Sequence, residues 1–475
     1  MSAGWLIFMF TLFLGGISYL ICLKIIWPEK TQELVDYLFE GNNNVVGAFS
    51  IIGTIFSTAV FFTAITALYI LYGFLILPIF LICSLSGFYL IKKKSIEIFS
   101  NTKRGIGSQI FVNRYKHIAN AISKPHIYFS YLFIYLFLML TTEIAAFNNV
   151  ISVFIKNDFW ASYIVYFIII TVVAYVYLSG FKGVLVTDTI QTLMIVILLI
   201  LMIFFTSSLD ISKNVSEIFL LPPLKDASIL IIGATLICIA WFSTSPEIWF
   251  RVISLRNKKD VKKTMSLAMF FLPIVIALPF VIIIFTELTP QFHGDSTVAF
   301  EVWANIFEKN NEIIFILFLS LMITAFFTTL DTFIITFSQI LYCIKDNNVL
   351  EKFLPSNPRY FSIIFTMVCL LIGLELQPIF NGIIGIYAGC LMIPVFMLTY
   401  VYPFLQKKKV AISYSSSSFL LQLIVACPII IFIESLVVNP NYSHLGYPFI
   451  PIIITFIEIV LLFVNYILSK NKLLR

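Results

Sequence analysis

Apolar residues in this sequence gather in long uninterrupted segments, and short polar stretches separate one segment from the next. Each segment holds about 20 residues, the length that an α-helix needs to cross the ~30 Å hydrocarbon core of a bilayer. The pattern predicts an all-α polytopic membrane protein, with one membrane domain over residues 1–475. Its thirteen predicted spans are 4–27, 44–66, 69–91, 126–150, 160–179, 184–207, 228–247, 264–287, 313–343, 361–378, 380–405, 416–438 and 447–468.

Composition agrees with a membrane protein and argues against other classes. Hydrophobic residues make up 60% of the chain and charged residues only 11%, against roughly 25% charged residues in soluble domains. The 7 cysteines lie within or at the ends of apolar segments without a CxxC spacing, so they predict neither disulfides nor a metal site. The sequence shows no nucleotide-binding loop, metal motif or nucleophile elbow, and we therefore do not expect an enzyme.

Basic residues predict the orientation in the membrane. Of the 30 lysines and arginines, all but Lys156, Lys213, Lys225 and Lys309 fall on one side if the N-terminus of a thirteen-span chain is outside. Cytoplasmic loops are enriched in lysine and arginine, so this side is predicted to face the cytoplasm. We expect a bacterial inner (plasma) membrane protein with a periplasmic N-terminus and a cytoplasmic C-terminus. The net charge of +6 then needs no nucleic-acid partner to explain it.

Two of the predicted spans contain residues that interrupt helices. The second span carries Gly53, and the seventh ends in "FSTSPE" with Pro246. Interruptions at matching places in two halves are typical of transporters with an inverted repeat, and substrate and ions bind beside them. The offset of five spans fits a five-plus-five repeat with halves at 44–207 and 228–405. Glycine and proline also occur in membrane helices without this role, so the simpler interpretation stays open.

The ninth span combines an aspartate with several hydroxyl residues on an apolar helix. A single hydroxyl can serve as structural glue by bonding a backbone carbonyl one turn back. An aspartate with several hydroxyls facing the protein interior also suits a dehydrated small cation, which takes oxygen ligands. The polar residues recur at spacings of three, four or seven, which predicts one stripe of Ser320, Thr324, Thr328, Asp331, Thr332 and Gln339.

Four stretches of the chain resemble signature regions of the sodium:solute symporter family, which includes bacterial proline, pantothenate, sialic acid and sugar symporters. They are "DYLFEGNNNVVGAFSIIGTIFSTAVFF" (36–62), "GFKGVLVTDTIQ" (180–191), "SPEIWFRVISLRNKKDVKK" (245–263) and "AFFTTLDTFIITFSQILY" (325–342). Their order and spacing agree with the family. The resemblance implies a leucine-transporter-type inverted repeat preceded by one extra helix at 4–27 and followed by two C-terminal helices at 416–468.

The resemblance also implies a shared sodium site between the second and ninth spans. Carried over by position, its backbone carbonyls would come from Gly53, Phe56 and Ala325. Its hydroxyl ligands would come from Thr328 and Thr329. Na⁺ is accordingly expected as the coupling ion.

Other polar residues are assigned on the same resemblance. Asp188 stands at the start of an apolar run, although an aspartate at the centre of a spanning helix costs about 3 kcal/mol. With Asp331 and Thr332 it would form a possible second sodium site or exit path. Ser57 and Glu143 are expected in the vicinity of the substrate. Glu143 stands in the span where relatives that bind acidic sugars carry an arginine, and it could meet a substrate amine or play a structural role near a helix end.

The expected function is sodium-coupled symport, in which a small organic solute such as an amino acid, sugar or organic acid is imported by alternating access. The expected partners are the solute, Na⁺ and the lipid bilayer, with no obligate protein partner. A lipid-linked saccharide flippase or exporter is one alternative, but it would not need the hydroxyl and aspartate stripe. A transporter-like nutrient sensor is another, and it would need a separate signalling partner.

The predicted topology can be tested with reporter fusions at Asn214 and Lys408. The first position is expected outside and the second inside, because the basic residues concentrate on the side of Lys408. Paired periplasmic and cytoplasmic reporters should therefore give opposite signals at the two positions. Equal signals at both would contradict the thirteen-span arrangement.

Overall fold

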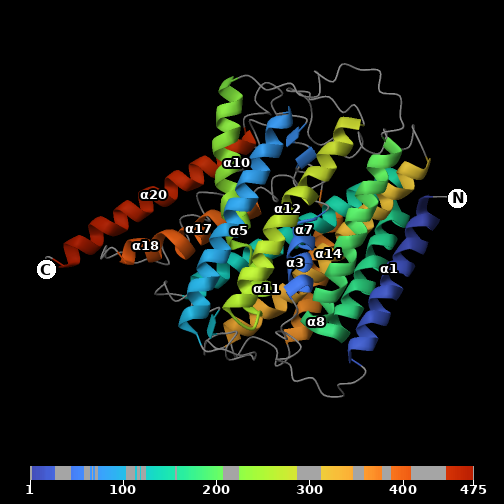
Figure 1. The fold of residues 1–475 in the computed structure, drawn as a ribbon, viewed down its shortest axis with the longest axis horizontal. Coiled ribbons are helices and arrows are strands. Elements are labelled where there is room, and N and C mark those ends of the chain that lie inside the picture. Colours follow the sequence, from blue (N-terminus) through green and yellow to red (C-terminus); the bar gives the residue numbers. More distant parts are fainter. Residues whose placement is uncertain are drawn as a thin grey trace.

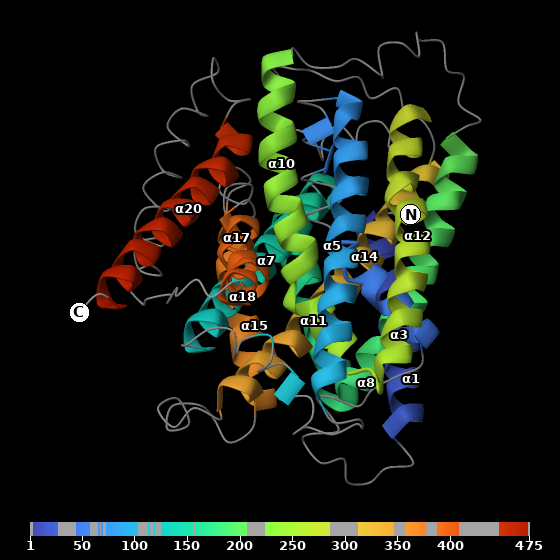
Figure 2. The ribbon, with the colours of Figure 1, turned by 60° about the vertical axis from the view of Figure 1, so that its left-hand side comes forward.

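The structure is a computed structural model, and every regular element in the part of the chain that it describes is a helix. Two views of the ribbon show these helices as a bundle, with the C-terminal helix leaning away from it (Figure 1, Figure 2). The residues described are 3–26, 44–57, 65–66, 68–69, 73–102, 113–114, 118, 125–155, 158–206, 224–285, 312–345, 358–376, 387–407 and 446–473.

The helices follow the predicted spans closely. Most have apolar residues on all sides, as is typical of helices within a membrane. Their bounds are α1 Ala3–Ile26, α3 Asn44–Gly53, the 3₁₀ turn η2 Gly73–Leu75, α5 Ile76–Asn101, α7 Pro125–Ile155, α8 Asp158–Thr206, α10 Leu224–Thr244, α11 Pro246–Ile253, α12 Lys258–Phe285, α14 Glu312–Lys345, α15 Pro358–Glu375, α17 Met392–Phe396, the π-helical turn η4 Met397–Val401, α18 Tyr402–Lys407 and α20 Gly446–Leu473.

The chain is a multi-pass membrane protein. Within the described residues, 7 helices are long and apolar enough to cross a membrane, and shorter apolar helices accompany them. The predicted span at 416–438 lies outside the described residues, so the total of thirteen spans and the five-plus-five repeat stay predictions. The long spans are Gly73–Asn101, Tyr128–Ser152, Trp160–Thr206, Ile231–Ile253, Lys258–Ile282, Ile313–Tyr342 and Tyr387–Leu405.

Helix α14 is a central helix of the bundle. It packs against α7, α8, α15 and α1, and every residue from 318 to 341 is buried. The predicted polar stripe is therefore buried as expected, but the apolar residues between its members are buried as well. The outward sides of other helices expose large apolar side chains, for example Ile197 and Phe204 on α8 and Phe456 on α20. Such a surface suits contact with lipid.

Helix α8 consists of two arms that meet at Gly180, where φ is 62° and ψ is −155°. Tyr175 in the first arm and Thr187 in the second both donate hydrogen bonds to the same oxygen of Asp331, at 2.7 and 3.2 Å. Twelve residues of straight helix would separate these two donors by about 18 Å. The chain therefore turns back at Gly180, and Figure 1 labels α8 near this bend. Glycine suits the position because it adopts positive φ without strain.

Both predicted helix interruptions are confirmed. Helix α3 ends at Gly53, and the chain continues through a turn at Thr54 and Ile55. Helix α10 ends at Thr244 and α11 begins at Pro246, with Ser245 between them at φ −49° and ψ 120°. Proline at the first position of α11 lacks an N–H that the helix would leave unpaired in any case.

Gly53 lets the end of α3 approach α8 and α14 closely. A Cβ atom at this position would lie 3.1 Å from Cγ2 of Thr328 and closer still to the hydroxyl of Thr192. That hydroxyl donates to the backbone carbonyls of Asp188 at 2.6 Å and Phe49 at 3.1 Å, so it cannot turn away without losing both bonds. A glycine is therefore needed where α3 ends.

Replacing Gly53 by alanine should destabilise the fold. Because the added methyl would overpack the contact with Thr192, we expect a loss of about 1–3 kcal/mol, seen as a lower unfolding temperature of the purified protein in detergent. Gly16→Ala is the control, since no atom lies within 4 Å of the added Cβ on α1. Adding Thr192→Ala to Gly53→Ala should recover part of the loss. Equal unfolding temperatures for Gly53→Ala and Gly16→Ala would contradict this close approach.

Candidate functional site

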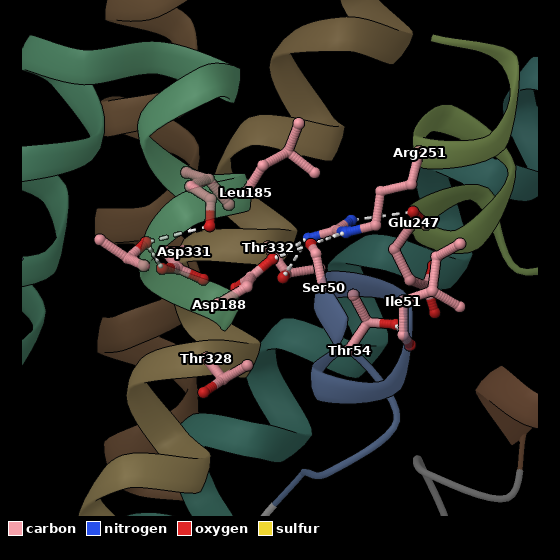
Figure 3. Close-up of polar contacts among 12 residues, drawn as sticks. Ser50, Ile51, Thr54, Leu185, Asp188, Glu247, Arg251, Thr328, Asp331 and Thr332 are labelled. Carbon is pink, nitrogen blue, oxygen red and sulfur yellow. Dashed lines mark hydrogen bonds and ion pairs between the residues drawn. The ribbon is translucent and has the colours of Figure 1, made fainter. Parts of the chain in front are cut away.

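A buried ion pair joins α8 to α11 at the centre of the described structure. Nη2 of Arg251, in the last turn of α11, lies 2.5 Å from Oδ2 of Asp188 in the second arm of α8, and both side chains are 0% exposed (Figure 3). Arg251 lies in an apolar stretch of α11 whose residues are all buried, so its guanidinium is enclosed by packed helices. In such surroundings a charge is stable only when it is paired and hydrogen-bonded.

Three further groups form hydrogen bonds with this pair. The hydroxyl of Ser50 on α3 donates to Asp188 at 2.6 Å and accepts from Nε of Arg251 at 2.7 Å. The hydroxyl of Thr332 on α14 accepts from Nη2 at 2.8 Å, and the backbone carbonyl of Glu247 accepts from Nη1 at 2.8 Å. One guanidinium thereby ties together α3, α8, α11 and α14 (Figure 3). We call Ser50, Asp188, Arg251, Asp331 and Thr332 the charged cluster.

Asp331 on α14 brings a second carboxylate to the charged cluster. Its Oδ2 accepts hydrogen bonds from Tyr175 and Thr187, and it is close enough to interact electrostatically with Asp188 and Arg251. Oδ1 of Asp331 and Oδ1 of Asp188 are buried and have no hydrogen-bond donor among the described residues. With two carboxylates and one guanidinium, the cluster carries one negative charge in excess when both acids are ionised. A cation or a proton must balance a charge buried in this way.

The residues predicted for the shared sodium site also lie together. The hydroxyl of Thr329 is 2.9 Å from the carbonyl oxygen of Ala325 and 3.1 Å from that of Phe56. Thr328 packs against Gly53, so all the predicted ligand positions meet where α3 ends beside α14. The hydroxyl of Thr328 donates to the carbonyl of Thr324 at 2.9 Å, which is the structural bond expected of a lone membrane threonine. The carbonyl of Gly53 accepts from the N–H of Phe56 at 3.0 Å.

Ser57 and Glu143, predicted near the substrate, are both buried. Ser57 follows the interrupted end of α3, and Glu143 lies on α7 next to Ile144, which contacts Gly373 of α15. The hydrogen bonds given above for Asp188, Arg251 and Asp331 come from other described residues. Their role in binding a substrate stays a prediction.

Arg251 is the charged member of the cluster that the sequence did not single out, because it counts among the basic residues of the predicted cytoplasmic side. The structure buries it to 1% exposure. A signal was present in the sequence, since Arg251 lies four residues after Glu247 in the apolar stretch "PEIWFRVI". Ser50 and Tyr175 were missed as well, since an isolated serine or tyrosine in an apolar span gives no sign of its partner.

Arg114, in a segment predicted to be cytoplasmic, forms hydrogen bonds with the end of α11. Its Nη1 donates to the carbonyls of Ile253 at 3.0 Å and Leu255 at 2.8 Å, and its guanidinium lies 4.0 Å from the centre of the Phe99 ring. An arginine is favourable at a helix C-terminus because it satisfies carbonyls that lack a partner within the helix. This contact fixes the short helix that carries Arg251.

Comparison with known proteins gives relatives in structure alone. No protein-family profile and no curated protein sequence matches the chain. A solved structure of a Na⁺-coupled sialic acid symporter, in its substrate-bound outward-open state, has a TM-score of 0.68 at 15% identity and covers 98% of each chain. The structure of MhsT in complex with L-phenylalanine has a TM-score of 0.52 at 13% identity, over 77% of this chain and 97% of that one. The chain therefore shares the fold of the symporter structure over nearly its whole length and that of the MhsT structure over about three quarters of it.

The excess charge of the cluster predicts an asymmetry between its members. Arg251→Gln leaves two carboxylates without their cation and should cost about 3–5 kcal/mol of stability. Asp188→Asn leaves Arg251 with Asp331 as a remaining acid and should cost less. Adding Asp331→Asn to Arg251→Gln should restore part of the loss, since the two sites are coupled. Unfolding temperatures of the purified variants in detergent measure these differences.

The control is Lys94→Gln, which removes a partly exposed pair with Glu97 at 3.4 Å. Pairs of this kind contribute at most about 1 kcal/mol. An Arg251→Gln variant as stable as Lys94→Gln would contradict the role given to the buried pair. So would a larger loss in Asp188→Asn than in Arg251→Gln.

Proposed function

We propose that the protein is a Na⁺-coupled secondary transporter that imports a small organic solute by alternating access. The observation that carries this proposal is the charged cluster, where two interrupted helices meet α8 and α14. Two buried carboxylate oxygens of the cluster have no donor within the part of the chain that the structure describes. Interrupted helices beside ion and substrate sites are typical of secondary transporters. The shared fold with a Na⁺-coupled symporter supports the same function.

The first sodium site of this proposal lies between the end of α3 and α14. The hydroxyl of Thr329 already lies 3.1 Å from the carbonyl oxygen of Phe56 and 2.9 Å from that of Ala325. Gly53 and Thr328 complete the set after small rotations that free their oxygens. A hard cation takes several such oxygen ligands in place of its hydration shell. Na⁺ bound here would join α3 to α14 and so couple the interrupted helix to the central one.

The second sodium site, or an exit path from the first, lies at the charged cluster. Oδ1 of Asp188 and Oδ1 of Asp331 offer two carboxylate oxygens that lack a donor among the described residues, and the hydroxyl of Thr332 contacts Arg251. A monovalent cation at these oxygens would cancel the excess negative charge. Arg251 then keeps the two aspartates from holding the ion too tightly, because its charge opposes that of Na⁺ at short range.

The proposed direction of transport is inward across a bacterial plasma membrane, with the N-terminus outside and the halves 44–207 and 228–405 moving relative to one another. One Na⁺ that enters gains about 2.3 kcal/mol from a potential of 100 mV. A tenfold sodium gradient adds about 1.4 kcal/mol. These energies support accumulation of the solute by several hundredfold per Na⁺.

The shared sodium site is tested by Thr329→Ala, which removes one ligand oxygen. The loss of one buried polar partner costs about 1–3 kcal/mol, so the half-saturating Na⁺ concentration should rise roughly tenfold or more. The measurement is thermal stabilisation of the purified protein as NaCl replaces KCl at constant ionic strength. It needs no knowledge of the solute.

The matched control is Thr206→Ala at the end of α8, where the hydroxyl donates to the carbonyl of Met202 at 2.7 Å. This bond resembles that of Thr329 to Ala325, but the residue is more than four helical turns from Asp188. Its sodium midpoint should equal that of the wild type. Equal midpoints for Thr329→Ala and the wild type would remove Thr329 from the site, and a wild-type protein indifferent to Na⁺ would contradict the proposed function.

A further inference from the structure

Glu247 is a buried carboxylate that the sodium sites do not use. It lies in the first turn of α11, directly after Pro246, and is 2% exposed. Its Oε1 accepts a hydrogen bond from the hydroxyl of Tyr135 on α7 at 3.0 Å. Its Oε2 is buried and has no hydrogen-bond donor among the described residues. One oxygen of this carboxylate is therefore held in place and the other is open to a partner.

The cation nearest in the chain, Arg251, is not an ion-pair partner of Glu247. Arg251 donates to the backbone carbonyl of Glu247, but its ion pair is with Asp188. Within the described residues no lysine, arginine or histidine forms an ion pair with the Glu247 side chain. The charge of Arg251 is already exceeded by Asp188 and Asp331, so Glu247 adds a further negative charge to the interior. Leaving it without a partner would be costly.

The surroundings of Glu247 hold it as a hydrogen-bond acceptor. Nε1 of Trp241 donates to the hydroxyl of Tyr135 at 2.8 Å, which leaves the hydrogen of that hydroxyl to point at Glu247. The position in the first turn of α11 also favours a negative charge, since the N-terminal end of a helix dipole is positive. Both effects favour a negative charge on Glu247, while its burial opposes that charge.

Glu247 also lies where the interrupted helices meet. Helix α11, which carries Glu247, contacts α3, and Figure 3 draws both helices around the charged cluster. Substrate and coupling-ion sites of secondary transporters typically lie at such interruptions. A buried ionisable residue inside a membrane protein is by default a candidate for that role.

We propose that the Glu247 carboxylate binds a positively charged nitrogen of the transported solute, an ammonium or a guanidinium group. This inference rests on the proposed transport function and narrows its substrate class to cationic or zwitterionic solutes. Oε2 is the oxygen that accepts from the solute, while Tyr135 and Trp241 are positioning residues that hold Oε1. A solute without such a nitrogen leaves a buried negative charge unpaired, so the site rejects it.

The test uses matched pairs of small solutes in which hydroxyls replace amines: alanine and lactate, glucosamine and glucose, and 1,4-diaminobutane and 1,4-butanediol. Thermal stabilisation of the purified full-length protein is measured with each solute in NaCl. At least one amine should stabilise the wild type while its partner does not. Glu247→Gln should weaken that response at least tenfold in apparent Kd, and Glu247→Asp should keep part of it.

Two further variants separate a solute contact from a structural role. Tyr135→Phe removes the hydrogen bond that positions Oε1, and it should weaken the response to the same amine without moving the sodium midpoint. Glu458→Gln changes another fully buried glutamate, on α20, whose oxygens have no donor among the described residues. It should leave both the amine response and the sodium midpoint as in the wild type.

The inference is overturned if no amine stabilises the wild type, if both members of each pair act equally, or if Glu247→Gln keeps the wild-type Kd. If Glu247→Gln does not fold, a wild-type Kd for the amine in Tyr135→Phe overturns the inference instead. The sodium titration is read separately. An amine response that depends on Glu247 in a protein indifferent to Na⁺ would support this site and contradict sodium coupling.

Discussion

The ion pair between Asp188 and Arg251 holds together the elements on which every other feature of the site depends. Its hydrogen bonds reach Ser50 on α3 and Thr332 on α14, so the two partners connect helices far apart in sequence. In a low-dielectric interior such a pair is stable only if its remaining donors and acceptors are satisfied. Because these bonds converge on one guanidinium, a movement of α11 must change the contacts of α3, α8 and α14 together.

Charge balance is the second constraint, and it links the proposed sodium and solute sites. The single positive charge of Arg251 is paired with Asp188. Among the described residues it therefore does not also balance the negative charges of the buried Asp331 and Glu247. The protein would therefore be most stable when cations occupy the site, and least stable when it is empty. In the proposed function Na⁺ supplies one of these charges and the nitrogen of the solute supplies another. The binding of Na⁺ and the binding of the solute would then be coupled, because each bound cation stabilises the same compact state of the protein.

The sequence was informative wherever the evidence lay within one segment. Continuous apolar runs predicted the helices, Gly53 and Pro246 predicted the two interruptions, and the hydroxyl stripe predicted a buried polar helix at α14. The resemblance to a symporter family brought Asp188, Asp331 and Thr332 together before the structure did. The sodium role of these residues stays a prediction.

The sequence does not show which residues interact when long stretches of chain separate them. Arg251 meets Asp188 across 63 residues and Ser50 across 201, and Tyr135 meets Glu247 across 112. Each of these residues looks ordinary in its own segment, and only the fold shows which opposite charge or donor it faces. The bond of Thr328 to Thr324 is local, but the sequence alone leaves it as an alternative to a ligand role, and only the distance shows that it forms.

The most direct test of the account is the stoichiometry of ²²Na⁺ binding to the purified protein at equilibrium, compared between wild type and Asp331→Asn. The wild type should bind Na⁺ saturably in a K⁺ background. Asp331→Asn should lose binding at the charged cluster, since the excess negative charge is then gone, and keep binding at the site between α3 and α14. A wild-type protein without saturable binding, or an Asp331→Asn variant with unchanged stoichiometry and affinity, would contradict the claim that Na⁺ balances the buried charge.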